Sequence, residues 1–175
     1  MRRLMAMGVF GVLVAMGEAM AEQGNSAAQL RLREQVRHEL AMLPYYTVFD
    51  NLMFQVRGNR VMLLGQVSRP ALKADSERVV RRIEGVAAVD NQIEVLPLSA
   101  YDDRLRLALF RALYGNDVLQ RSLLSAVPPV RIIVKNGNVT LEGTVEHETE
   151  RALAGLLANG VSGVFSVTNN LRVDR

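Results

Sequence analysis

The feature that most constrains the fold of this chain is a seven-residue pattern that occurs twice. VMLLGQV begins at Val61 and VTLEGTV begins at Val139, 78 residues later, so both read V-x-L-x-G-x-V. At this offset residues 54–95 align with 132–173 without a gap. Self-similarity over this length predicts two structural units that share one architecture.

Helical periodicity upstream of each pattern extends the repeat. An i, i+4, i+8 spacing of apolar residues predicts a helix at the start of each copy, from about residue 26 to 42 in the first. The matching residues, at an offset of 73, are Leu32, Val36 and Leu40 with Leu105, Leu109 and Leu113. The smaller offset places about five extra residues between the first helix and the first strand of the second copy.

Each copy predicts the same order of elements. Short strands over 54–57 and 132–135 precede Gly58-Asn59 and Asn136-Gly137, which are hairpin signals because such residues accept positive φ. V-x-L-x-G-x-V forms the next strand. A helix follows over about 70–84 or 148–159, and a final strand covers 89–96 or 167–173.

We therefore expect an α+β fold of two tandem αββαβ units, each a three-stranded mixed sheet covered on one face by two helices. The expected boundaries are 26–96 for the first unit, 97–101 for a linker and 102–175 for the second unit.

Four glycines recur at equivalent positions and are expected to be structural. Gly65 and Gly143 are predicted on the buried face of their strand, where a missing side chain makes room for the helix that follows. Gly85 and Gly163 come soon after that helix and are predicted to stop it.

The first residues predict export. A basic start at Arg2-Arg3 precedes an uncharged apolar run over 4–17, and Ala19-Met20-Ala21 offers a signal peptidase site. We expect a signal peptide over 1–21, cleaved after Ala21, and a soluble periplasmic protein. An uncleaved N-terminal anchor is the alternative, although Glu18 ends the apolar run short of the roughly 20 residues that a membrane span needs.

The two hairpin and strand patterns resemble the BON domain. The resemblance rests on V-x-L-x-G-x-V at 61–67 and 139–145, followed after a helix by G-V-x-x-V-x-N-x-(I/L)-x-V at 85–95 and 163–173. That family occurs in bacterial envelope proteins, including osmotically inducible periplasmic ones, and is often duplicated. It implies binding of phospholipid or membrane-associated partners, without catalysis. Dual-BON lipoproteins carry an anchoring cysteine, which this chain lacks.

Composition and motifs give little support to other classes of function. The chain has no cysteine, hence no disulfide framework or thiolate metal site, and its 21 basic and 18 acidic residues form no block that would favour nucleic-acid binding. We expect no cofactor, no metal and no catalytic site. His147-Glu148 is half of a metal motif but is better explained as a solvated turn. Helix capping explains Asp102-Asp103 better than a catalytic carboxylate pair.

The candidate functional site is where the copies disagree. In the helix over 70–84, Arg78, Arg81 and Arg82 predict a solvated face, with a phosphate-binding cluster as the alternative. The equivalent helix over 149–160 carries no charge after Arg151 and is apolar nearly all round, which favours contact with something beyond its own sheet. The candidate lipid- or partner-binding residues are Arg151, Leu153, Leu156 and Asn159.

Three interpretations of that helix stay open. Its extra face packs on the other unit or on a second chain, or it contacts lipid headgroups with Arg151 near a phosphate, or its leucines are ordinary exposed residues. We therefore expect as partner a phospholipid surface or an envelope protein, with a homo-oligomer as a further option. The alternative function is a scaffold module of an envelope or secretion assembly.

Overall fold

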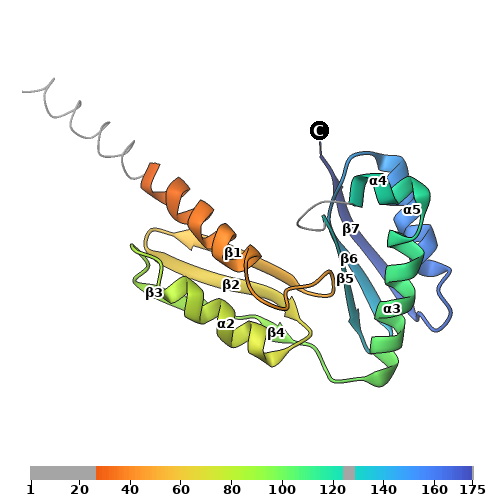
Figure 1. The fold of residues 1–175 in the computed structure, drawn as a ribbon, viewed down its shortest axis with the longest axis horizontal. Coiled ribbons are helices and arrows are strands. Elements are labelled where there is room, and N and C mark those ends of the chain that lie inside the picture. Colours follow the sequence, from red (N-terminus) through yellow and green to blue (C-terminus); the bar gives the residue numbers. More distant parts are fainter. Residues whose placement is uncertain (1–26, 124–128, 175) are drawn as a thin grey trace, which may run out of the picture.

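The computed structural model describes residues 27–123 and 129–174 and contains two α+β units (Figure 1). Unit 1, residues 27–96, begins with a helix over 27–41, here called the first helix. It continues with β1 (Asn51–Arg57), β2 (Arg60–Val67), α2 (Pro70–Arg81), β3 (Ala88–Asn91) and β4 (Glu94–Val95). Unit 2, residues 100–174, contains α3 (Ala100–Tyr114), α4 (Asp117–Leu123), β5 (Val130–Lys135), β6 (Asn138–Val145), α5 (Glu148–Asn159) and β7 (Ser166–Val173). The expected signal peptide lies outside the described residues.

Both sheets are mixed, as the sequence predicts. β1 is antiparallel to β2 and β5 is antiparallel to β6. The last strand of each unit is parallel to the central strand, with β7 beside β6 over its full length. In unit 1 the single strand expected over 89–96 is instead two short pieces, β3 and β4, both parallel to β2.

Two helices cover one face of each sheet and enclose a separate core. In unit 1 the core includes Leu32, Val36 and Leu40 of the first helix, together with Leu63 of β2 and Val80 of α2. In unit 2 the equivalent residues are Leu105, Leu109, Leu113, Leu141 and Ala158. The periodicity of the sequence therefore identifies the buried stripe of the opening helix in both units.

The extra residues of the second copy form part of a short helix. The side chain of Asn116 accepts hydrogen bonds from the backbone N–H groups of Val118 and Leu119, so it caps the start of α4. Leu119 is buried in the core of unit 2. The insertion thus adds a core contact to one unit only.

The repeated glycines of V-x-L-x-G-x-V occupy the same setting in both units, but not the one that was predicted. Gly65 has φ +106° and Gly143 has φ +121°. A Cβ atom on Gly65 would overlap the carbonyl oxygen of Asn51, and one on Gly143 would overlap that of Pro129. The close neighbour is therefore backbone at the start of the adjacent strand, and the prediction that the following helix fills this space is wrong. Positive φ gives a second reason for glycine.

A repeated asparagine joins the second helix of each unit to its last strand. The side-chain amide of Asn91 donates to the carbonyl oxygen of Lys73 at 2.9 Å, and its oxygen accepts from the backbone N–H of Ile93. Asn169 does the same with Arg151, at 2.8 Å, and with Leu171. This shared bridge explains why both copies carry asparagine here.

The ends of the helices differ slightly from expectation. α5 has the expected bounds, but α2 ends at Arg81 and not near residue 84. Gly85 and Gly163 lie in the turns that follow, with φ of +88° and +92°. α3 begins at Ala100, and the side chain of Ser99 caps it by accepting from the N–H of Asp102. The last two residues of the expected linker are therefore helical.

Asp102 has a role that the sequence did not predict. Its carboxylate is buried and accepts hydrogen bonds from the backbone N–H groups of Asn136 and Gly137, each at 2.9 Å. It therefore binds the β5–β6 hairpin turn to the start of α3. Asn136 and Gly137 both have positive φ, as a type I′ turn requires. In the first hairpin Gly58 has positive φ but Asn59 does not.

The two units contact each other through residues 46–50 and β5, which lie side by side in Figure 1. The N–H of Ile132 donates to the carbonyl oxygen of Val48 at 2.7 Å. The Arg131 guanidinium lies over the Tyr46 ring, 4.5 Å from its centroid, and donates to the carbonyl oxygen of Thr47 at 3.0 Å. We call this set of contacts the junction.

Candidate interaction face of unit 2

The candidate helix α5 buries one stripe and exposes the opposite side. The buried stripe of α5 consists of Glu150, Ala154 and Ala158. The carboxylate of Glu150 accepts from the backbone N–H groups of Glu146 and His147, so this charge is satisfied at the N-terminus of its own helix. Leu156 lies on the outer side and is 70% exposed. Its position agrees with the sequence pattern.

The four predicted site residues do not form one surface. Leu156 and Asn159 are both exposed, and the Asn159 amide donates to the carbonyl oxygen of Gly155. Arg151 is exposed and forms an ion pair with Glu148 at 2.8 Å. Leu153 is half-buried and packs against the core of unit 2. Leu153 therefore contributes to folding, because it lies on the flank of α5 and not on its outer side.

The neighbouring helix α3 adds residues that the sequence analysis missed. α3 and α5 pack together over the same sheet (Figure 1). Leu105, Leu109 and Leu113 point into the core, so Arg104, Leu107 and Arg111 fall on the opposite side of α3, where all three are exposed. Their i, i+3, i+7 spacing was a usable signal. We call Arg104, Leu107, Arg111, Leu156 and Asn159 the outer face.

The outer face combines exposed apolar groups with positive charge. Leu107 is 51% exposed. Among the described residues, no carboxylate lies within 4.0 Å of Arg104 or Arg111, and Arg104 lies 6.0 Å from the centroid of the Tyr101 ring. Two guanidinium groups without carboxylate partners beside two exposed leucines can bind an anionic surface that also accepts apolar side chains.

Unit 1 provides an internal comparison for this face. Glu34 and Arg78 stand where unit 2 has Leu107 and Leu156. Arg78 forms an ion pair with Asp75, and Arg81 forms one with Glu77. Hydrogen bonds from Asn91 and Arg81 hold the pKa of Glu77 below its usual value. The arginines of α2 are thus largely neutralised in place, which favours a solvated helix face over a phosphate-binding cluster.

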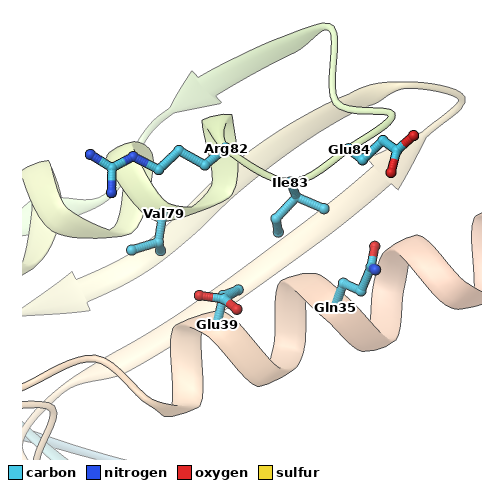
Figure 2. Close-up of a pocket in the computed structure, with 6 residues that line it drawn as sticks. All are labelled: Gln35, Glu39, Val79, Arg82, Ile83 and Glu84. Atoms are coloured by element: carbon cyan, nitrogen blue, oxygen red, sulfur yellow. The ribbon is translucent and has the colours of Figure 1, made fainter.

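A cavity of about 260 Å³ lies between the first helix and α2 (Figure 2). Gln35 and Glu39 line one side of the cavity, and the apolar side chains of Val79 and Ile83 line the opposite side. The Arg82 side chain extends away from Glu84 in Figure 2, so the charged groups do not converge on one point. Within residues 27–123 and 129–174, no cluster of three His, Cys, Asp or Glu residues could hold a metal ion.

Among the described residues, no helix is both long and apolar enough to cross a membrane.

The comparison with known proteins identifies one family for this chain. A family model described as the BON domain matches residues 29–97 and 116–175, together more than half of the chain. No curated protein matches the chain. Two solved structures from Chlamydia trachomatis are similar at 13% and 14% identity. One is CdsD, a structural protein of the type III secretion system, and the other is its C-terminal domain.

The alignment with CdsD covers 83% of this chain and 94% of that chain, with a TM-score of 0.30. The alignment with the C-terminal domain covers 81% and 96%, with a TM-score of 0.28. At these TM-scores neither structure informs the function of this chain.

Proposed function

This chain belongs to the BON-domain family, and from that premise we propose that it is an exported, non-enzymatic envelope protein whose unit 2 binds phospholipid surfaces through the outer face. The observation that carries the proposal is the pairing of Leu107 and Leu156 with Arg104 and Arg111 on the exposed side of two adjacent helices. Action during envelope or osmotic stress is part of the same proposal.

The physical basis is a balance of modest terms. Full burial of a leucine side chain contributes roughly 1.5–3 kcal/mol, and each cation near an anionic bilayer adds about 1 kcal/mol. Leu107 and Leu156 are already partly covered, so each can gain only part of that amount. We therefore expect reversible binding that requires anionic lipid and weakens with salt.

Sedimentation with vesicles tests the proposal. We expect the protein to sediment with vesicles of phosphatidylglycerol and phosphatidylethanolamine, and not with pure phosphatidylcholine vesicles. The double variant Leu107→Glu/Leu156→Glu should lower the affinity at least about tenfold, because both apolar contacts are lost and two anions are added. Both side chains are exposed, so the fold should persist, which circular dichroism checks.

Unit 1 offers a matched control. Arg78→Glu places an anion at the position equivalent to Leu156 and should leave vesicle binding within about twofold of wild type, because surface substitutions outside a contact have small effects. Absence of wild-type binding to anionic vesicles would contradict the proposal, and so would equal losses in the control and the double variant.

A scaffold role in an envelope assembly is the second candidate. It is favoured by the junction, in which one BON unit of this chain already binds another. Light scattering of the purified protein distinguishes the two. A stable oligomer that Leu107→Glu/Leu156→Glu dissociates would assign the outer face to protein contact.

A further inference from the structure

The edge strands of the two sheets are equivalent in fold but differ in what covers them. β5 is the edge of the second sheet, and Arg131 and Ile133 on it are 7% and 5% exposed. β1 is the edge of the first sheet, and the equivalent residues Met53 and Gln55 are exposed. The junction covers β5. No other part of the described chain covers β1 in the same way.

The backbone of β1 presents hydrogen-bonding groups outward. Arg57 and Arg60 flank the two-residue turn and pair with each other, so alternate residues of β1 direct N–H and C=O groups away from β2. Phe54 and Val56 are among them. Ile132, the equivalent of Phe54, donates its outward N–H to Val48 in the junction. Phe54 and Val56 have no such partner within the described residues.

A groove of about 800 Å³ runs along this edge. β1 forms one side, and Arg33 and Arg37 of the first helix form part of the other. Arg57 lies at its hairpin end. Glu34 neutralises part of this charge through an exposed ion pair with Arg37 at 2.7 Å. A free strand edge beside a helix is the geometry in which extended peptides add a strand to a sheet.

We propose that the groove lined by β1, Arg33 and Arg37 binds an extended polypeptide segment with acidic side chains, which pairs with Phe54 and Val56 and extends the sheet of unit 1. Val48 gives the precedent, since a chain segment already bonds to the equivalent edge of unit 2. A second copy of this chain is a poorer occupant, because its own β1 edge is flanked by Arg33 and Arg37 and would bring the same positive charge to the groove. This inference concerns unit 1 and is independent of the outer face.

Selection from a random library of displayed ten-residue peptides, followed by synthesis of the best binders, tests this proposal on the whole protein. We expect the recovered peptides to be acidic. Backbone N-methylation at alternate peptide positions should weaken binding at least about tenfold, because each methyl group removes a donor to the strand. Bound peptide should slow hydrogen exchange of the Phe54 and Val56 amides at least about tenfold, and not that of the amides of β5.

Charge reversal separates this groove from the outer face. Arg33→Glu/Arg37→Glu should weaken binding of the acidic peptide about tenfold or more and leave vesicle binding unchanged. Arg104→Glu/Arg111→Glu should do the opposite. The inference is overturned if the peptides recovered are not acidic, if the groove variant binds them as well as wild type, if exchange slows elsewhere than β1, or if the free protein is a dimer with β1 protected.

Discussion

At the scale of single residues, the glycine of V-x-L-x-G-x-V determines how closely the first two strands of each unit approach. Gly65 and Gly143 face the carbonyl oxygens of Asn51 and Pro129 with no room for a Cβ atom, and both have positive φ. Two separate costs thus fall on any other residue: overlap with backbone, which cannot rotate away as a side chain can, and a φ value that L-residues disfavour.

Gly143→Ala should therefore destabilise the protein by about 3 kcal/mol or more, since backbone strain of this kind costs about 1–3 kcal/mol before the overlap is added. Gly85→Ala is the matched control. Gly85 also has positive φ, but nothing lies within 4 Å of the position of its Cβ. Gly85→Ala should lower the free energy of unfolding by about 1–2 kcal/mol. Urea unfolding of the two variants measures the difference, and equal costs would show that only φ matters here.

At the scale of elements, the helices of unit 2 are held to their sheet by polar contacts as well as by the core. The Tyr114 hydroxyl at the end of α3 donates to the carbonyl oxygen of Val130 at the start of β5, at 2.6 Å. Burial raises the pKa of Tyr114 to about 12 from its usual value near 10, against a smaller opposing effect of the Arg131 charge. The protonated phenol is thus part of the contact between helix and strand.

This raised pKa predicts a loss of stability in alkali. Above pH 10 the phenol ionises first in the unfolded chain, so the stabilising contribution of Tyr114 is complete below pH 10 and is lost as pH rises towards 12. The loss should stay below about 1.4 kcal/mol per pH unit, since the phenol is only partly buried and solvent screens the effect. Urea unfolding at pH 9 and pH 11 should show a smaller decrease in Tyr114→Phe than in wild type. Equal decreases would contradict the assignment.

Much of the element order could be predicted from the sequence, because repeated patterns report on backbone needs that both copies share. The hairpin at Asn136-Gly137 and the buried leucines of α3 are examples. The partner of Gly65 could not be predicted, since it depends on strand register. Leu107 was missed because α3 was considered only for its buried stripe. Leu153 packs partly against the core of unit 2, a contact that helical periodicity alone does not reveal.

At the scale of the whole molecule, two similar units are made unequal by where one contacts the other. The junction uses the edge of unit 2 and the segment over 46–50, and Phe49 packs against the core of unit 2. It also places Phe49 edge-on to Phe110, with ring centroids 6.2 Å apart. No sequence pattern within one unit specifies this, because the contacts join residues that occupy different positions in the repeat. The consequence is one covered strand edge and one open edge.

Arg131 is the residue on which the junction most depends, because it combines a cation–π contact with Tyr46 and a hydrogen bond to Thr47 while 7% exposed. Arg131→Ala should weaken the junction by about 2–3 kcal/mol and leave each core intact. The unfolding transition measured by calorimetry should then broaden or split into two. Chymotrypsin should also cleave faster after Leu98, which is 93% exposed and lies between the units.

Lys135→Ala is the matched control for that variant. It removes the 2.5 Å ion pair with Glu94, a second charged contact between the units, but both side chains are nearly half exposed, so the change should cost less than about 1 kcal/mol. If Arg131→Ala unfolds in the same single transition as Lys135→Ala, with the same cleavage rate at Leu98, then the apolar contact of Phe49 holds the units together and Arg131 only fills the space beside it.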